Sequence, residues 1–307
     1  MENQTKVREM IQKRVKEKKR IMDKIVPGFL LIMALISVFT TFGIILTLIT
    51  DAVRFFSAVP VSEILSTDLA PLNKNPRFGF IPLLVGTITT SFIAMLVAVP
   101  VGLAAAVYLS QFASDKVRKL VKPMLEILAG IPTIVYGFFA YSFVTPMLMN
   151  LIPGLEAKNA LSPGLVMGIM IIPMVASLSE DAMNAVPEIM KEGALGLGST
   201  RLEVALKVVI PAAISGIMAS IVLGISRAIG ETMIVTIASG SSKAFTLDIT
   251  QSMQTMTGYI VEFTSGDAAS GTTGYYSLYA VGLILFLFTM LMNQFAHYIS
   301  KKYREAY

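Results

Sequence analysis

The sequence predicts an all-α integral membrane protein with six transmembrane helices, and three observations support that fold class. Apolar residues make up 54% of the 307 residues, whereas charged residues make up only 15%. The apolar residues occur in runs of about 18 or more, a length that crosses a bilayer as a helix. The runs are continuous and show no period-two alternation, so helices are favoured over membrane strands.

The first three spans are predicted from apolar runs with few charges. Residues 27–50 and 83–111 contain no charged side chain, and the internal Pro100 is common for such helices. The third span covers residues 123–150 and is interrupted by the Gly-Ile-Pro triplet at 130–132. Backbone groups freed by such a break must face protein or water, so both a pore-lining break and a simple kink fit the triplet.

The remaining spans are predicted at residues 161–178, 211–238 and 275–299. Within these three, charged side chains occur only in the fifth span, as Arg227 and Glu231. The two residues are four apart, so on a straight helix they share one face. Residues 27–299 therefore form one predicted transmembrane domain.

The placement of Lys and Arg predicts that both termini are cytoplasmic. Nineteen of the 25 Lys and Arg residues fall on the side that holds the N-terminal segment 1–26, the loop 180–210 and the tail 300–307. Five fall on the other side, and Arg227 lies inside a span. This asymmetry is the positive-inside signal. The net charge of +5 is thus explained by topology, and no nucleic-acid partner is expected.

The basic N-terminal segment has two interpretations. Val7, Ile11, Val15 and Met22 recur at near-helical spacing, which suits an amphipathic helix lying on anionic membrane lipid. A solvated basic tail that only fixes topology fits equally well. A cleaved signal peptide is disfavoured, because the basic and apolar regions are both too long and no A-x-A site follows.

Residues that could support catalysis or metal binding are scarce. The chain has no Cys and a single His, which excludes thiolate chemistry and disulfides and gives no metal site. Glu180 and Asp181 are adjacent, so on a helix they point apart, and we expect them to be solvated loop residues. An enzyme is therefore a poor candidate, and no directly bound cofactor is expected.

The loop at 180–210 is predicted to be structured. Pro187 suits a first helical position, Gly196 and Gly198 suit a helix end, and Thr200 with Glu203 forms a capping-box pattern that starts a second helix. A phosphate-binding loop is excluded, because Ser199 stands where its Lys would be needed.

Glu192, Gly193 and Ala194, followed by Gly198 and by the V-x-I-P at residues 208–211, resemble the EAA loop of bacterial ABC-importer permeases. Gly193 replaces the first Ala of that motif, and Val and Ile replace Ile and Leu near its end. The resemblance implies a type I ABC-importer permease fold. It also implies that this loop is a coupling helix, which docks on an ATPase subunit.

Three further stretches resemble the PstC-type membrane subunit of the bacterial phosphate importer. They are "FGFIPLLVGT" at 78–87, "LEILAGIPTIVYGFFA" at 125–140 and "GISRAIGETMIV" at 224–235. The resemblance implies a subunit of the bacterial cell membrane that forms half of the path for inorganic phosphate. It also implies its partners: a PstA-type second permease, a PstB-type ATPase dimer that uses the ATP, and a PstS-type extracytoplasmic phosphate-binding protein.

Two alternatives for function stay open. A permease of the same family for another oxyanion or small solute would share these motifs. A self-sufficient secondary transporter would predict inverted repeats or several intramembrane carboxylates, and neither is evident.

The Arg227 and Glu231 pair also has two interpretations. Arg227 lies 16 residues after Pro211, or about 24 Å along a straight helix, past the midplane. The pair either fixes helix packing as an ion pair, or lines the path, with Arg227 contacting the passing oxyanion and returning to Glu231 when the path closes.

Overall fold

The computed structural model describes the backbone of residues 2–302, and the side chains of these residues except 2–24, 267, 296, 297, 299, 300 and 302. The amphipathic pattern predicted near the N-terminus and most of the tail 300–307 lie outside the described side chains. The chain forms two compact units, residues 1–51 and residues 52–307.

The first unit is a single helix. Helix α1 (Glu2–Ala58) continues through the predicted boundary at residue 26 without a break, and its apolar part at residues 25–58 is long enough to cross a membrane. The last turns of α1 belong to the second unit. There Phe55 is fully buried and stacks on Phe80, with 5.5 Å between the ring centroids.

Three long helices of the second unit match predicted spans. They are α3 (Ile81–Val107), extended by the π-helical segment η1 (Tyr108–Phe112), α7 (Leu161–Asn184) and α14 (Thr273–Lys302). Pro82 lies in the first turn of α3, where its missing N–H leaves no helical bond unmade. Helix α7 extends six residues beyond the predicted end of the fourth span.

The third span is broken where the Gly-Ile-Pro triplet predicts a break. Helix α4 (Asp115–Gly130) ends there, and α5 (Thr133–Phe139) continues through η2 (Ala140–Val144) into α6 (Thr145–Met149). The two halves are bent by 86°. Pro132 cannot continue a helix, and the Leu128 carbonyl at the break accepts a hydrogen bond from the Tyr136 hydroxyl at 2.9 Å.

The fifth span differs from the prediction of one helix over 211–238. A chain of short pieces, α9 (Arg201–Val204), η3 (Ala205–Val209) and α10 (Ile210–Ala212), meets α11 (Ile214–Ile229) at a bend of 72°. Residues 230–232 then leave the helix before α12 (Met233–Ala238). If each bent pair is one span, the described chain has six candidate crossings, as predicted.

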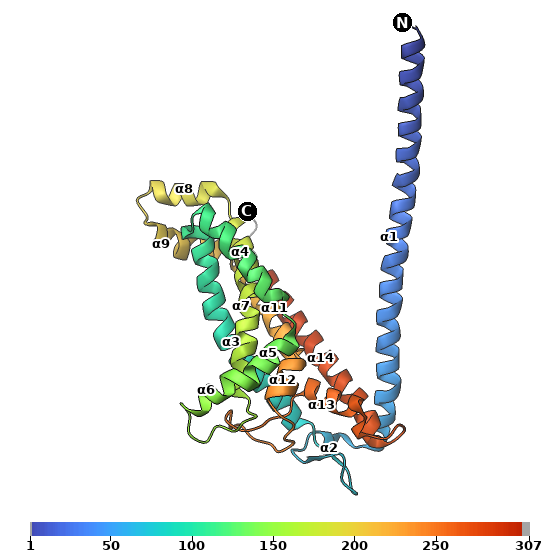
Figure 1. Ribbon diagram of the computed structural model, residues 1–307, viewed down its shortest axis with the longest axis vertical. Coiled ribbons are helices and arrows are strands. Elements are labelled where there is room, and N and C mark those ends of the chain that lie inside the picture. Colours follow the sequence, from blue (N-terminus) through green and yellow to red (C-terminus); the bar gives the residue numbers. More distant parts are fainter. Residues whose placement is uncertain (1, 303–307) are drawn as a thin grey trace. The chain divides into compact units, whose positions relative to one another are not determined.

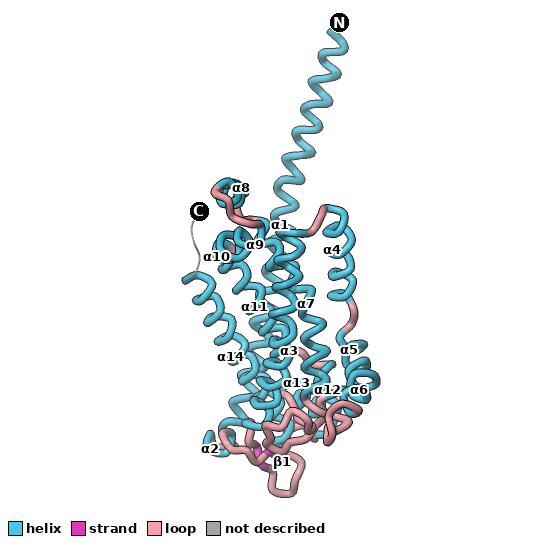
Figure 2. Tube along the Cα trace, turned by 90° about the vertical axis from the view of Figure 1, so that its left-hand side faces the viewer, coloured by secondary structure: helices cyan, strands magenta, loops and turns pink. Residues whose placement is uncertain are grey.

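The sequence did not reveal several short elements that lie together at one end of the second unit (Figure 1). They are α2 (Val61–Ile64), the antiparallel pair β1 (Leu69–Ala70) and β2 (Arg77–Phe78), α13 (Met256–Glu262) and the π-helical η4 (Phe263–Asp267). Aromatic rings hold them, including Tyr259 stacked on Phe263 with 4.3 Å between the ring centroids. At the opposite end lie α9 and α8 (Glu188–Gly196) (Figures 1 and 2).

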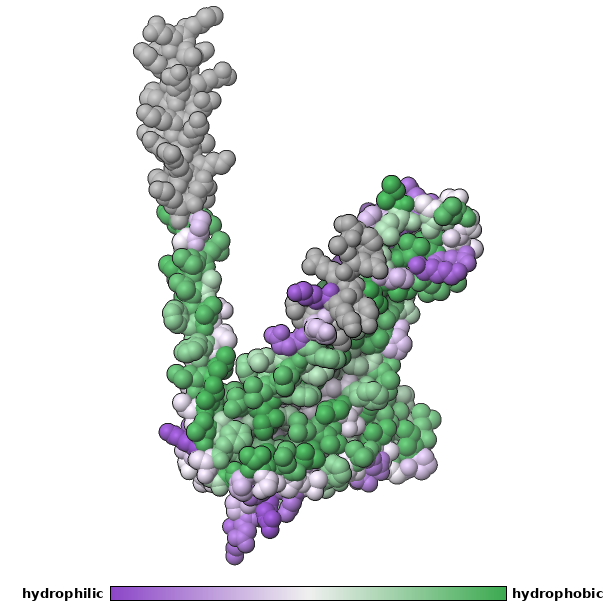
Figure 3. All heavy atoms as spheres, turned by 180° about the vertical axis from the view of Figure 1, so that it is seen from behind, coloured by the Kyte–Doolittle hydropathy of each residue, from purple (hydrophilic) through white to green (hydrophobic). Residues whose placement is uncertain are grey.

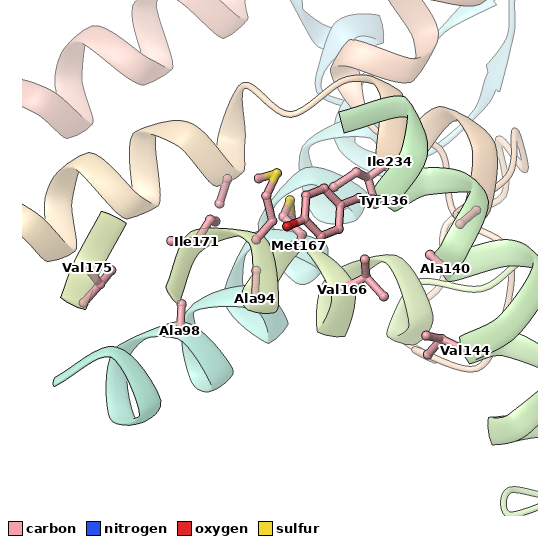
Figure 4. Close-up of a cluster of buried hydrophobic side chains, with 13 residues drawn as sticks. Ala94, Ala98, Tyr136, Ala140, Val144, Val166, Met167, Ile171, Val175 and Ile234 are labelled. Carbon is pink, nitrogen blue, oxygen red and sulfur yellow. The ribbon is translucent and has the colours of Figure 1, made fainter. Parts of the chain in front are cut away.

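Small residues bring the long helices into close contact. A Cβ on Gly168 of α7 would lie 2.8 Å from the Ala94 carbonyl oxygen of α3. Such close backbone approach is how helices associate in lipid, where apolar burial gives little driving force. The core built around this contact includes Met167 and Ile171 of α7 with Tyr136 of α5 and Ile234 of α12 (Figure 4).

The surface of the second unit has separate apolar and hydrophilic regions, as expected for a membrane protein. On the face shown in Figure 3, apolar residues cover the middle of the unit, and hydrophilic residues gather at its ends.

Candidate functional site

Helix α8 begins after a proline and is closed at its C-terminal end by local hydrogen bonds. Pro187 is the residue immediately before the helix, one position earlier than predicted. At the other end the Gly198 N–H donates to the Leu195 carbonyl at 2.9 Å, and the Ser199 N–H donates to the Ala194 carbonyl at 3.2 Å. This pair of bonds is a Schellman motif, and Gly198 has the positive φ of +90° that the motif needs.

The capping box that starts α9 is confirmed. The Thr200 hydroxyl accepts from the Glu203 N–H at 3.3 Å, and the Glu203 carboxylate accepts from the Thr200 N–H at 3.0 Å. Lys207 forms an ion pair with Glu203 at 3.2 Å. The turn between α8 and α9 is therefore held from both sides.

The four residues predicted for ATPase coupling occupy different places in this loop. Glu192 and Gly193 are exposed on α8, whereas Ala194 is partly buried against the cluster that contains Val204 and Val209. Gly198 forms the turn. The structure thus leaves Glu192 and Gly193 available for contact and gives Ala194 and Gly198 a place in the loop's own packing.

Two apolar residues of the loop escaped the sequence reasoning. Ile189 is 77% exposed and Leu197 is 90% exposed. No atom lies within 4 Å of where a Cβ would stand on Gly193 or Gly196. Ile189, Gly193 and Gly196 share one face of α8 by helical spacing, which is the signal that could have identified it. We call Ile189, Glu192, Gly193 and Gly196 the outer face of α8.

Helix α5 of the broken third span contacts α12 of the broken fifth span. A Cβ on Gly137 of α5 would lie 3.0 Å from the Met233 carbonyl oxygen and 3.1 Å from the Ile234 Cα. Helix α5 therefore packs backbone against backbone on α12, directly after the break that separates α12 from α11.

The predicted shared face of Arg227 and Glu231 is wrong, because α11 ends at Ile229 and Glu231 lies in the break. The buried Glu231 carboxylate accepts instead from the N–H groups of Met233 and Ile234, at 3.1 and 3.3 Å. Helix α11 starts at Ile214, so Arg227 lies about 20 Å along it rather than about 24 Å from Pro211.

Arg227 is exposed on the last turn of α11. Within the described part of the chain, its guanidinium forms no ion pair with Glu231 or any other carboxylate. Tyr136 of α5 belongs to the buried cluster that also contains Ala228 and Ile234, which lie on either side of the break. The role of Arg227 and Glu231 in transport stays a prediction.

Glu180 and Asp181 are not the solvated loop residues that we expected, because both belong to the last turns of α7. Glu180 is fully buried, 3.5 Å from the Arg118 guanidinium and 3.6 Å from the Lys122 ammonium of α4. Asp181 is exposed and pairs with Lys122 at 2.9 Å. The four-residue spacing of Arg118 and Lys122 places both cations on one side of a helix, and this was the sequence signal that could have indicated a carboxylate partner.

A polar cavity of about 640 Å³ lies beside this cluster. Its lining includes Arg118 and Asn184 on one side and Glu188, Lys191 and Leu195 of α8 on the other. The cavity leaves room between α8 and the start of α4.

The family described as "Binding-protein-dependent transport system inner membrane component" matches residues 98–305, which include both broken spans and α8. The chain belongs to this permease family. Over 277 residues, the permease is 32% identical to the phosphate transport system permease protein PstC of Mesorhizobium japonicum, covering 84% of this chain and 83% of that protein. The resemblance to PstC-type permeases is confirmed.

A second relative of the permease is the probable ABC transporter permease protein YqgH of Bacillus subtilis, 29% identical over 243 residues, with 79% of this chain and 78% of that protein covered. Among solved structures, the permease superposes on the bacterial alginate ABC transporter in complex with alginate pentasaccharide-bound periplasmic protein. The TM-score is 0.60 at 17% identity, covering 94% of this chain and 99% of that chain.

The inward-facing MetNI methionine ABC transporter gives a TM-score of 0.57 at 16% identity, covering 74% of this chain and 95% of that chain. At such identities these likenesses concern the fold alone. They confirm the predicted type I ABC-importer permease fold.

Proposed function

We propose that the permease is one of two membrane subunits of an ATP-driven importer of inorganic phosphate in the bacterial cell membrane. The observation that carries this proposal is the outer face of α8. It presents Ile189 and Glu192 beside Gly193 and Gly196, where no neighbouring atom lies within 4 Å of an added Cβ. A short helix with two glycines on its outer face can lie close to a partner's groove.

The motifs on either side of Gly198 connect the outer face of α8 to the start of α9. Because the Schellman motif and the capping box fix both sides of the turn at Gly198, a push on α8 moves the loop as one body. The partner is a PstB-type ATPase dimer, which hydrolyses the ATP, so the permease itself binds no cofactor. A PstA-type second permease completes the path, and a PstS-type binding protein delivers phosphate at the extracytoplasmic end.

Phosphate is proposed as the substrate because relatives that cover most of the chain are named phosphate transport permeases. Arg227 supports an oxyanion, since a guanidinium binds phosphate through two parallel hydrogen bonds. In the described structure Arg227 forms no ion pair, so it has no carboxylate partner to exchange when it meets a dianion. Sulfate has the same shape and is the competing substrate.

The experiment is reconstitution of the permease with the three proposed partners in liposomes. We expect uptake of labelled phosphate that requires ATP and the binding protein and that excess sulfate does not reduce. A matched assembly with a hydrolysis-deficient ATPase serves as the control. Uptake without ATP would support a secondary transporter, and uptake of sulfate in place of phosphate would overturn the substrate.

A further inference from the structure

Helix α4 is attached to the second unit in an unusual way. No residue of α4, all of which the structure describes, is buried. Its apolar residues Val117, Val121 and Leu125 are only partly buried. The specific contacts are polar and come from Arg118 and Lys122, one turn apart on the side that faces α7.

Glu180 is the residue on which these contacts converge. Its carboxylate is fully buried, with Arg118 and the Asn184 amide near Oε1, at 3.5 and 3.3 Å, and Lys122 3.6 Å from Oε2. Arg118 also donates to the Leu109 carbonyl at 2.7 and 3.1 Å. The Glu180 carboxylate thus ties α4 to α7, and Arg118 ties α4 to η1.

The same carboxylate lies close to α8. Glu180 bonds Asn184, which is the last residue of α7, and only residues 185–187 separate Asn184 from α8. Val186 within this connection is buried, so the connection is anchored. Between α8 and α4 themselves, the polar cavity separates α8 from Arg118 at the start of α4. A displacement of α8 therefore reaches α4 through the end of α7.

We propose that Glu180 is a positioning residue that makes α7 and α4 move together, so that a displacement of α8 is passed to the 86° break between α4 and α5. The proposal rests on the proposed function, because it assumes that an ATPase moves α8. Its physical basis is that a buried carboxylate shared by two cations is costly to separate from either. Glu180 acts through α4 and touches no substrate.

The test uses Glu180→Gln in the complete reconstituted assembly, with Asp115→Asn, an exposed carboxylate in the first turn of α4, as the control. Gln keeps the size and one hydrogen-bond acceptor but removes the charge that holds both cations. We expect the ATP hydrolysed per phosphate transported to rise about tenfold in Glu180→Gln, the factor that corresponds to one charge-assisted contact, and to stay at the parent value in Asp115→Asn.

A second measurement separates coupling from mere stability. The chain has no native Cys, so spin labels can be placed at Lys119 on α4 and Ala185 after α7 in a cysteine-free assembly. We expect one narrow distance in the parent with and without ATP, and a broadened distance with ATP in Glu180→Gln. If Glu180→Gln fails to assemble, Lys122→Gln, which leaves the Arg118 contact, is expected to give the same broadening.

The outcomes distinguish the two proposals. If the parent assembly shows no ATP-dependent phosphate uptake, the proposed function fails. If the parent transports phosphate and the Gln variants keep both its ATP ratio and its narrow distance, the role of Glu180 is overturned and the proposed function stands.

Discussion

At the residue scale, the absence of a side chain has a different physical consequence at each of three glycines. Gly198 has φ of +90°, a backbone conformation that other residues adopt only with strain. Gly137 lets α5 touch the backbone of α12, whereas Gly193 leaves open surface. The first was predictable, because the capping box that follows marks a helix boundary. The second was not, since its contact partner lies almost 100 residues further along the chain.

Replacing Gly198 with Val is expected to uncouple the ATPase. A β-branched residue at this φ costs about 1–2 kcal/mol, and no atom lies near enough for a clash to add to it. The subunit should reach the membrane, while phosphate uptake per ATP falls severalfold. Gly154→Val is the control, because Gly154 has a similar φ of +87° at the opposite end of the molecule. Normal coupling in Gly198→Val would contradict docking through this loop.

Replacing Arg227 with Lys is expected to reduce phosphate uptake about tenfold or more, because an ammonium cannot form the two parallel bonds of a guanidinium. Assembly and basal ATP hydrolysis should be unchanged. Arg77→Lys, an exposed arginine of the short strand β2, is the matched control. Glu231→Gln should keep α12 in place, because its amide oxygen can still accept from the Met233 N–H. Parent-like uptake by Arg227→Gln with Glu231→Gln would show that both residues only pack.

At the element scale, the two breaks differ in how far local sequence determines them. Pro132 makes the third-span break predictable, since proline removes a helical hydrogen bond. The residues at 230–232 include no proline, and α-helix was a fair expectation for them. That break is held by tertiary contacts, including a 2.7 Å hydrogen bond from the Thr257 hydroxyl to the Glu231 carbonyl. Such long-range bonds carry no local sequence signal.

Gly137→Ala is expected to separate α5 from α12. Its Cβ would lie 3.0 Å from a backbone oxygen that cannot rotate away, and overpacking of this kind costs about 1–3 kcal/mol. We expect a lower Tm of the purified assembly and weaker phosphate uptake. Gly130→Ala, where no atom lies within 4 Å of the new Cβ, should leave the Tm near the parent value. Equal Tm values for the two variants would contradict the close contact.

At the scale of the whole molecule, the positions of the spans could be predicted from the sequence, whereas the structures at the two ends of the second unit could not. Long apolar runs determine where the chain crosses, and each confirmed or bent span overlaps one of them. The small elements at one end, such as α13, are too short for periodicity to reveal. The burial of Glu180 also escaped, because adjacency to Asp181 suggested solvent, whereas the cations that neutralise it come from α4.

The predicted orientation can be tested with single cysteines. Thr67, Lys158 and Ser265 are in the loops and segments of one end, whereas Ser114 and Ser199 are near α4 and α8. We expect the first three to react with an impermeant thiol reagent in intact cells, and the last two to react only after lysis. Labelling of Ser199 from outside would reverse the topology and remove α8 from the cytoplasm.

The 86° break also has a consequence for how the protein is made. A ribosome-bound chain presents residues 133–149 as a run without charge, about long enough for the translocon to insert as a span. In the finished fold this run is turned sharply from α4 and rests through Gly137 on α12, which is synthesised much later. The nascent segment therefore lacks this contact until α12 has been synthesised. Chains arrested before Met233 will leave the Gly137 side of α5 uncovered.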